Sequence, residues 1–328
     1  MRYFLTLASL IGSVLATART TPPSGALTVG SSGKYSTIQD AVDALSTSST
    51  SAQSIFIYSG TYSEQVTIPK LSGALSVYGY TTDTSDYTNN VVTIEHSSSL
   101  LSGAANDEAT GTVINLSASS SFYNINIKNT YGKGSQAIAL AAYNSKQAYY
   151  GVGLYGYQDT LLAETGTQFY GKCYIEGAVD FIFGQSAEAW IDSSDIGVSA
   201  GGGSITASGR TSSSSSSWYV LNNVNIAAAS GSSVSSGTVY LGRPWTEYAR
   251  VMVQNSELSS IINSAGWSVW STSTSNTEAV TFETYGNSGS GATSCCTASF
   301  STKASSALAI TTVLGSDYSS WVDTSYIA

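Results

Sequence analysis

Charged residues and cysteines are scarce in this chain. Lysine and arginine together number 12 and aspartate and glutamate 21 among 328 residues, which gives a net charge of −9. Nucleic acids and anionic membranes both attract basic surfaces, so the shortage of basic residues argues against either as a partner. Three cysteines are too few for a disulfide framework, and their odd number leaves at least one without a partner in the same chain.

Histidine occurs only once, as His96, and no C-x-x-C motif is present. We therefore expect no zinc site and no metal or other cofactor. Cys173 lies in an apolar, strand-like run, which predicts an inert thiol in the core. Cys295 and Cys296 are adjacent, and because a disulfide between neighbouring residues is strained, we expect these two not to be bonded to each other.

Long apolar runs are absent beyond the N-terminus. Residues 4–16 (FLTLASLIGSVLA) follow Arg2 and lead to small-residue sites that end at Ala16 or Ala18, a pattern typical of a secretory signal peptide. The run is too short for a comfortable membrane span, and a buried N-terminal helix is the alternative interpretation. We therefore expect a signal peptide over residues 1–18 and a secreted, extracellular monomer whose single domain covers 19–328. The triplet that begins at Asn115 is a glycosylation sequon compatible with secretion.

Short strand-like segments follow one another through most of the chain. They alternate apolar and polar residues, are rich in β-branched and aromatic side chains, and are separated by Gly, Ser or Asn. Similar segments, such as FYNINIKNT and QFYGKCYIEGAVD, recur at intervals of roughly 20 to 27 residues, which is the signature of a solenoid. The pattern predicts an all-β fold, a single-stranded parallel β-helix. A β-sandwich is the competing architecture, but the tight hairpin dipeptides that it needs are scarce.

Other segments predict the ends, the loops and the turns of the β-helix. Apolar residues at helical spacing predict a short helix over 35–45, with Ser36 or Thr37 as its cap, that closes the first coil. From residue 271 onward the chain is rich in Ser, Thr, Gly and Ala, which predicts a C-terminal tail packed on the β-helix with a short helix near 304–313. The serine run 212–217 is expected to be a flexible loop. Four asparagines are candidates for side-chain ladders at the turns: Asn124, Asn126, Asn223 and Asn225.

Two acids stand among apolar and glycine residues between positions 156 and 184. Asp159 and Asp180 are 21 residues apart, so in a solenoid of this period they lie on adjacent coils, about 4.8 Å from each other. Gln136 precedes Gln158 by 22 residues, so it falls on the coil before, and both glutamines join the acids in a stacked patch on one face. Two carboxyls so close titrate together, which leaves one as an acid and the other as a base or nucleophile. Arg243, in the segment LGRPW, is a candidate to hold one carboxylate bidentately.

The residues by themselves leave alternatives open. The acids could form structural ion pairs, or they could serve a retaining glycosidase, whose carboxyls are also about 5 Å apart. Arg210 and Arg250 fit a structural role and the rim of a site equally well. Residues 197–201 match the G-x-S-x-G nucleophile motif around Ser199, but no helical pattern follows and the only histidine precedes it, so we interpret this match as chance.

Five segments together resemble the pectin methylesterases, which are right-handed parallel β-helix enzymes. They are QAIAL (136–140), GYQDTL (156–161), GAVDFIFG (177–184), TASGR (206–210) and LGRPW (241–245), and the similarity extends over the whole mature chain. The resemblance implies a carboxylic ester hydrolase that removes methyl groups from methylated pectin, a homogalacturonan, and releases methanol. Two departures, Ala178 where many plant members have Thr and Ser208 where Gln is common, bear on the preferred pattern of methylation.

The resemblance also implies a role for each site residue. Asp180 would be the nucleophile, and Asp159 the acid that protonates methanol and then the base that activates water. Gln158 and Gln136 would donate hydrogen bonds to the oxyanion, Arg243 would hold Asp180, and the substrate-binding Trp245 would pack against a sugar ring. Another polysaccharide-active β-helix enzyme, a glycosidase or lyase, and an inactive pectin-binding homologue remain the alternatives.

Overall fold

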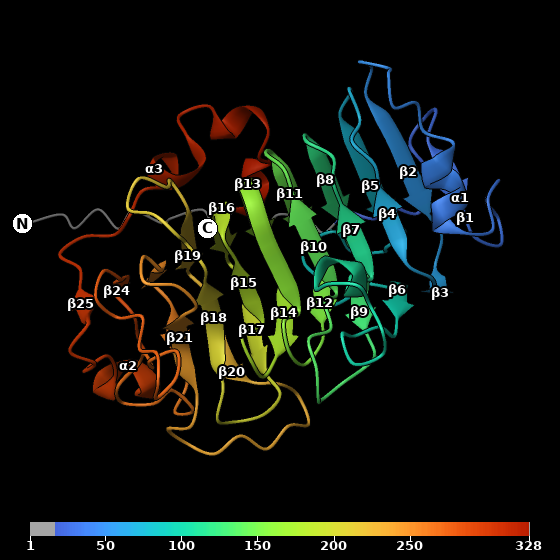
Figure 1. Cartoon of the computed structure of the whole chain (residues 1–328). Helices are drawn as coiled ribbons and strands as arrows, with labels where there is room; N and C mark the ends of the chain where they lie inside the picture. Colours follow the sequence, from blue (N-terminus) through green and yellow to red (C-terminus); the bar gives the residue numbers. More distant parts are fainter. Residues whose placement is uncertain (1–16, 328) are drawn as a thin grey trace, which may run out of the picture.

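The computed structural model describes residues 17–327, and its strands wind into a right-handed parallel β-helix (Figure 1). Every strand pairing between named strands is parallel, and each coil contributes one strand in turn to three stacks. The prediction of a parallel β-helix is thus confirmed, and the β-sandwich is excluded because it requires antiparallel pairs. The predicted signal peptide lies almost entirely outside the described residues.

The first stack carries the functional site described below. Its strands, in spatial order, are β4 (Val66–Ile68), β7 (Val113–Asn115), β10 (Leu140–Tyr143), the first half of β13 (Leu161–Gly171), β15 (Ile182–Gly184), β18 (Ser204–Ser208) and β21 (Tyr240–Pro244). Their inward side chains, among them Val113, Leu140 and Leu161, belong to the main core. The alternate side chains therefore point outward, as the two-residue period of a strand requires.

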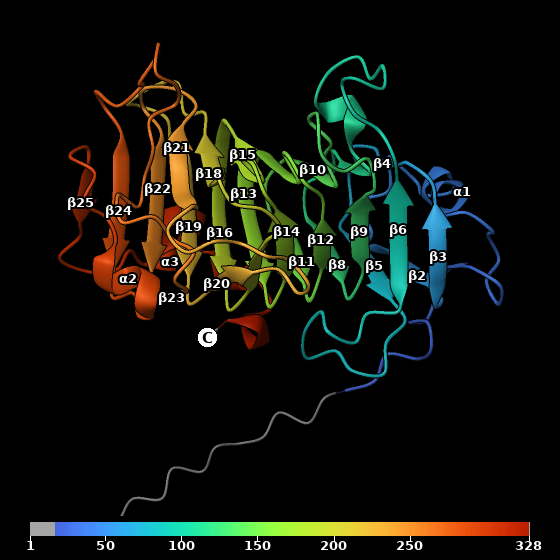
Figure 2. The ribbon, with the colours of Figure 1, turned by 90° about the horizontal axis from the view of Figure 1, so that it is seen from below.

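The second and third stacks complete each coil (Figure 2). The second contains β1 (Leu27–Val29), β2 (Gln53–Ile57), β5 (Leu75–Gly79), β8 (Ser120–Tyr123), β11 (Gln147–Tyr150), the second half of β13, β16 (Ser186–Asp192), β19 (Trp218–Asn222), β22 (Arg250–Gln254), β24 (Thr281–Tyr285) and β25 (Ser301–Lys303). The third contains β3 (Gly60–Ser63), β6 (Val92–His96), β9 (Asn126–Asn129), β12 (Gly153–Tyr155), β14 (Tyr174–Gly177), β17 (Asp195–Val198), β20 (Asn225–Ala228) and β23 (Glu257–Leu258).

A sharp turn between the second and third stacks repeats in seven coils. In each coil one residue with positive φ follows the second-stack strand: Asn124, Gly151, Lys172, Ser193, Asn223, Asn255 and Gly286, with φ between 49° and 62°. Asparagine and glycine adopt this left-handed conformation at the lowest cost, which explains why they predominate. The predicted asparagine ladder is only partly correct, because Asn126 and Asn225 lie in the third stack and other residue types interrupt the turn positions.

The helices lie outside the strand stacks, one of them over the first coil and the others in the C-terminal part of the chain. The predicted N-terminal helix is present as α1 (Ile38–Asp43); Thr37 caps it by accepting a hydrogen bond from the backbone N–H of Asp40, and Ile38, Ala41 and Val42 are buried against the first coil. Toward the C-terminus lie α2 (Ser290–Ser294) and α3 (Ile310–Leu314). Two short 3₁₀ segments, Tyr318–Ser320 and Thr324–Tyr326, follow α3, and a further one, Glu108–Thr110, precedes β7. None of the helices within residues 17–327 has both the length and the apolar character needed to cross a bilayer.

The C-terminal tail runs back over the outer face of the second stack. Val313, Leu314, Val322 and Tyr326 form a second hydrophobic cluster with strand residues such as Trp190. The Tyr150 hydroxyl accepts a 2.7 Å hydrogen bond from the backbone N–H of Asp323, and the Tyr326 hydroxyl donates one to the carbonyl of Thr84. The prediction of a packed tail with a short helix near its middle is confirmed.

One cysteine prediction is confirmed and the other is wrong. Cys173 is a free, fully buried thiol, and burial raises its pKa to about 12. Cys295 and Cys296, in contrast, form a disulfide with each other. The bond is compatible with the fold because Cys296 has a φ of 74°, and because both sulfurs approach Gly266, where any side chain would collide with them.

The sequon at Asn115 is closed to modification in the folded protein. The Asn115 side chain is completely buried, and its amide donates hydrogen bonds to Ser120 Oγ and to the Tyr149 hydroxyl. A glycan on this nitrogen would have to displace both bonds and part of the core, so Asn115 serves the interior of the β-helix.

Candidate active site

The strand register brings Asp159 and Asp180 onto neighbouring coils. Gln158 forms a parallel bridge with Val179, and Leu161 of β13 pairs with Ile182 of β15, so the two acids occupy equivalent positions one strand spacing apart. The backbone N–H of Asp159 donates to the carbonyl of Val179, which fixes the offset. Adjacent strands are about 4.8 Å apart, so the backbones of the two acids lie at that distance.

Both acids adopt the same unusual backbone conformation. Asp159 has a φ of 66° and Asp180 a φ of 50°, in the left-handed region that side-chain-bearing residues rarely adopt. Each stands two residues before a first-stack strand begins, where the chain turns into that strand. Backbone strain of this kind is concentrated at functional sites, and both carboxyls line one cavity of about 260 Å³ on the outer side of the first stack.

Arg243 binds Asp180 through two parallel hydrogen bonds. Its Nε donates to Oδ1 at 2.9 Å and its Nη2 to Oδ2 at 2.6 Å, which is the bidentate geometry of an arginine and a carboxylate. The third nitrogen, Nη1, donates to the carbonyl of Trp270, and the guanidinium lies 4.3 Å from the centre of the Trp270 ring. Because every part of the guanidinium has a partner, Arg243 holds Asp180 in one orientation.

Asp159 has very different surroundings, although it is equally buried. The side chains are 7% and 5% exposed for Asp159 and Asp180, but the Asp159 carboxyl makes no hydrogen bond to any residue in the described part of the chain. Burial, and after it the negative charges of Asp180 and Asp107, raise the pKa of Asp159 to about 8, against an opposing effect of Arg243. Burial also raises the pKa of Asp180, but there the hydrogen bonds and charge of Arg243 work in the opposite direction. The cavity therefore pairs an acid whose pKa is raised to about 8 with a second acid whose two oxygens are bound by an arginine.

Two amides and three aromatic rings surround the acids. Within residues 17–327 no acceptor binds the side-chain N–H groups of Gln136 or Gln158, so both are free to donate into the cavity. Trp245 packs against Phe183, with ring centroids 6.2 Å apart. The complete lining consists of Asp107, Gln136, Gln158, Asp159, Asp180, Phe183, Ala207, Arg243, Trp245 and Trp270. All six residues that the sequence nominated thus line one cavity.

Four lining residues were not anticipated from the sequence. Phe183 and Ala207 belong to an outward row in which Phe183 pairs with Ala207 and Ala207 with Arg243 on successive strands. The motif GAVDFIFG contains the signal for Phe183, since an outward residue follows Ile182 by one position. Trp270 and Asp107 arrive on loops, and a loop has no periodicity from which its position could be predicted.

Arg210 and Arg250 serve a structural role away from the cavity. Arg210 Nε donates to the carbonyl of Ser215, while Arg250 Nε donates to that of Ser217 at 2.7 Å. The Arg250 guanidinium also lies 4.4 Å from the centre of the Trp218 ring. These bonds fix the serine run 212–217 to two arginines. The prediction that this run is a flexible loop is therefore corrected to a loop that is held by hydrogen bonds.

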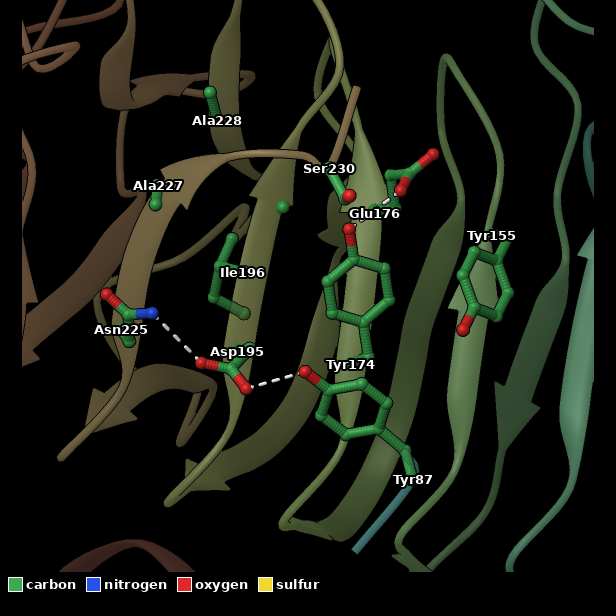
Figure 3. Close-up of a pocket in the computed structure, with 11 residues that line it drawn as sticks. Tyr87, Tyr155, Tyr174, Glu176, Asp195, Ile196, Asn225, Ala227, Ala228 and Ser230 are labelled. Carbon is green, nitrogen blue, oxygen red and sulfur yellow. Dashed lines mark hydrogen bonds between the residues drawn. The ribbon is translucent and has the colours of Figure 1, made fainter. Parts of the chain in front are cut away.

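A second hollow, on the third stack, has no acid free for chemistry (Figure 3). The Tyr87 hydroxyl donates to Asp195 Oδ2 and the Tyr174 hydroxyl to Glu176 Oε2, both at 2.7 Å, while the Asn225 amide donates to Asp195 Oδ1. Tyr87 also stacks on Tyr174, with ring centroids 5.1 Å apart. These contacts fasten the connection between β5 and β6 to the third stack, so the hollow has a structural explanation.

The fold and the cavity define a class of protein: a parallel β-helix with an unlike pair of buried acids on its outer surface. Comparison of the sequence and the structure with known proteins identifies the family within this class. The sequence model of the pectinesterase family matches residues 26–307. The chain therefore belongs to the pectinesterase family of carboxylic ester hydrolases.

Individual relatives agree with this assignment along nearly the whole chain. A pectinesterase from Aspergillus aculeatus is 53% identical over 318 residues, which cover 96% of each protein. A solved pectin methylesterase structure from Aspergillus niger superposes with a TM-score of 0.88 at 49% identity, covering 94% of this chain and 100% of the other. A carrot pectin methylesterase gives a TM-score of 0.81 at 28% identity and covers 94% of this chain and 98% of its own.

Proposed function

We propose that this chain hydrolyses the galacturonate methyl esters of pectin to pectate and methanol, with Asp180 as nucleophile and Asp159 as general acid and base. The observation that carries the proposal is the unlike surroundings of the two acids. Asp180 is bound by Arg243 through two hydrogen bonds, whereas Asp159 has no hydrogen-bonding partner among the described residues and holds its proton to about pH 8. One acid is ready to attack and the other to donate a proton.

In the first step an Asp180 oxygen attacks the carbonyl carbon of the methyl ester. A bond forms between that oxygen and the carbon, and the bond from the carbon to the methoxy oxygen breaks. Asp159 gives its proton to the departing methoxy group, which leaves as methanol, and becomes ionised. The side-chain N–H groups of Gln136 and Gln158 are placed to donate to the oxyanion that develops on the carbonyl oxygen. The product of this step is a covalent anhydride between Asp180 and galacturonate.

In the second step water resolves the anhydride. The ionised Asp159 removes a proton from a water molecule, and the resulting hydroxide attacks the galacturonate carbonyl carbon. The bond to the Asp180 oxygen breaks, so Asp180 returns as a carboxylate held by Arg243, Asp159 is protonated again, and the sugar leaves with a free carboxyl group. All groups used in both steps are side chains of this chain, and Trp245 offers a ring face on which a sugar can pack.

The test is release of methanol from highly methylated pectin by the purified protein. Asp180→Asn and Asp159→Asn should each reduce the turnover rate by a factor of at least about 10³, because each removes a group that acts at the reacting bonds. Asp43→Asn, the same change at an exposed position, is the matched control and should retain full activity. Substantial residual activity in Asp180→Asn would show that Asp180 is not the nucleophile.

The products distinguish the alternative functions. Shortened chains or unsaturated ends would indicate a glycosidase or a lyase, and binding to pectin without methanol release would indicate an inactive homologue. Either result from the wild-type protein would overturn the esterase proposal.

We also propose that residues 1–18 are removed as a signal peptide and that residues 19–328 act as a secreted monomer. The support is that the chain is tied into the fold close to this boundary. The Thr17 carbonyl accepts a hydrogen bond from the backbone N–H of Thr84, the Arg19 backbone exchanges two hydrogen bonds with Thr81, and the Arg19 guanidinium lies about 5 Å from the Tyr78 and Tyr123 rings. N-terminal sequencing of protein from the culture medium should give Arg19 or Thr17 as the first residue. Retention of residues 1–16 would contradict cleavage.

A further inference from the structure

Asp107 enters the cavity of Asp159 and Asp180 from outside the strand stacks. It lies in the connection between β6 and β7, directly before the 3₁₀ segment Glu108–Thr110. This connection is fastened beside Gln136, because the backbone N–H of Leu100 donates to the Gln136 carbonyl and that of Leu101 to Ser135 Oγ. The Asp107 carbonyl in turn accepts hydrogen bonds from the backbone and hydroxyl of Thr110. The position of Asp107 at the cavity is thus fixed by its backbone.

The carboxyl group of Asp107 has no structural partner that would explain its placement. Its Oδ1 is buried and accepts no hydrogen bond from any residue between 17 and 327. A buried carboxylate oxygen without a donor is unfavourable, and such atoms in folded proteins call for an explanation. A role in the cavity supplies one.

The charges in the cavity are unbalanced. Asp107, Asp159 and Asp180 supply three carboxyls, and Arg243 is the one cationic residue of the lining. Arg243 donates its Nε and Nη2 hydrogen bonds to Asp180. The charge of Arg243 opposes the rise of the Asp159 pKa, but within residues 17–327 no cationic side chain forms a hydrogen bond with Asp107 or Asp159, and two such carboxyls at one cavity do not both ionise freely.

We propose that Asp107 is a positioning residue that keeps the catalytic proton on Asp159. Of these two carboxyl groups only that of Asp107 is ionised, and its negative charge disfavours ionisation of Asp159. The proposal rests on the function given to Asp159 above, since only a protonated Asp159 can supply the proton that departing methanol needs. Asp107 is a half-buried residue whereas Asp159 is buried, so the ionised form of Asp107 loses less of its hydration.

The charged groups around Asp159 agree with this division. Asp180 and Arg243 face Asp159 from the following coils, and Asp107 faces it from the preceding connection. After burial and the charge of Asp180, the charge of Asp107 is the next cause that raises the pKa of Asp159. Burial raises the pKa of Asp107 as well, so the two carboxyls titrate as a coupled pair, in which the more deeply buried Asp159 is the one that retains the proton.

The experiment is the pH dependence of methanol release by Asp107→Asn. Turnover by the wild-type enzyme should fall at alkaline pH as Asp159 loses its proton. In Asp107→Asn the midpoint of this fall should move to lower pH by roughly 0.5 to 1 unit, because one neighbouring negative charge has been removed. Asp107→Glu keeps the charge and should restore the wild-type midpoint.

Glu108→Gln is the matched control. It removes the same charge from the adjacent residue, which does not line the cavity, and should leave the midpoint unchanged. An unshifted midpoint in Asp107→Asn, or an equal shift in Glu108→Gln, would overturn the proposal.

A second measurement does not depend on activity. Carbon-13 NMR titration of the Asp159 carboxyl should give a lower midpoint in Asp107→Asn than in the wild type, and equal midpoints would refute the proposal even if the enzyme is fully active. If instead the proposed esterase function itself is wrong, the wild-type protein will release no methanol at any pH, which distinguishes this outcome from a wrong role of Asp107. Should Asp107→Asn not fold, Asp107→Ser removes the same charge and serves in both measurements.

Discussion

At the scale of single residues, the site places two residues of one type in unlike surroundings. Asp159 and Asp180 have the same chemistry, the same left-handed backbone and nearly the same burial. What differs is one neighbour, since Arg243 bonds to both oxygens of Asp180 and to neither oxygen of Asp159. Arginine suits this position because its planar group reaches both carboxylate oxygens at once, which a lysine ammonium does not.

Arg243→Lys tests this contribution. The positive charge remains but the paired hydrogen bonds are lost, so we expect turnover to fall by roughly 10² to 10³ while KM changes little. Steady-state methanol release gives both constants. The control is Arg250→Lys, the same change at an arginine that binds only loop carbonyls and a Trp218 ring, which should lower thermal stability but not turnover. Turnover close to wild type in Arg243→Lys would show that charge alone is sufficient.

At the scale of elements, the C-terminal tail closes a face that the coils leave exposed. Outward side chains of the second stack, such as Phe169 and Trp190, would contact water if α3 and the residues after it did not cover them. Burial of apolar area is the main source of stability in such packing. At the acids of the first stack, in contrast, the covering side chains leave a cavity of about 260 Å³.

Leu314→Ala measures what the tail contributes. Leu314 is 2% exposed, and removing its buried methyl groups should lower the free energy of unfolding by about 2 to 4 kcal/mol. Chemical denaturation followed by fluorescence checks the value. Thr312→Ala, at an exposed position in the same helix, should change it by less than about 0.5 kcal/mol. Equal effects of the two substitutions would mean that the tail adds little to the core.

At the scale of the whole molecule, Asp159 reduces stability at alkaline pH. The native protein keeps a proton on Asp159 up to about pH 8, whereas an unfolded chain loses it near pH 4. Between these values the native state binds more protons than the unfolded state, so this group makes stability fall as the pH rises. Its stabilising contribution is fully present below about pH 4 and is lost as pH passes through 8.

Asp159→Asn should therefore become the more stable protein at high pH. We expect its melting temperature to match that of the wild type at pH 4 and to exceed it by about 3 °C at pH 8.5, where the wild type must bury a charge. Thermal unfolding followed by circular dichroism at both values measures the difference. Asp43→Asn should show no such dependence on pH, and a constant difference for Asp159→Asn would contradict the linkage.

The sequence by itself determined the architecture and the pair of acids. The period of the strand segments predicts the coils, and a separation of 21 residues places Asp159 and Asp180 side by side because no long loop interrupts that coil. The same reasoning does not extend to Arg243, which is 63 residues beyond Asp180, with the connections 209–217 and 229–239 between. Spacing made Arg243 only a candidate to hold one of the two carboxylates, the family resemblance implied Asp180, and the structure shows the two hydrogen bonds.

Tertiary structure alone decided what depends on loops and on local backbone angles. Asp107 reaches the cavity on a connection with no periodic pattern, and the charge that we assign to it follows from neighbours in space. The bond between Cys295 and Cys296 depends on a positive φ at Cys296 and on the room beside Gly266, neither of which composition reveals. A repeating strand pattern encodes distances between coils, because every coil obeys the same hydrogen-bond spacing. The protonation of Asp159 depends instead on burial and on charges that converge from separate coils and loops, and only the folded chain brings these together.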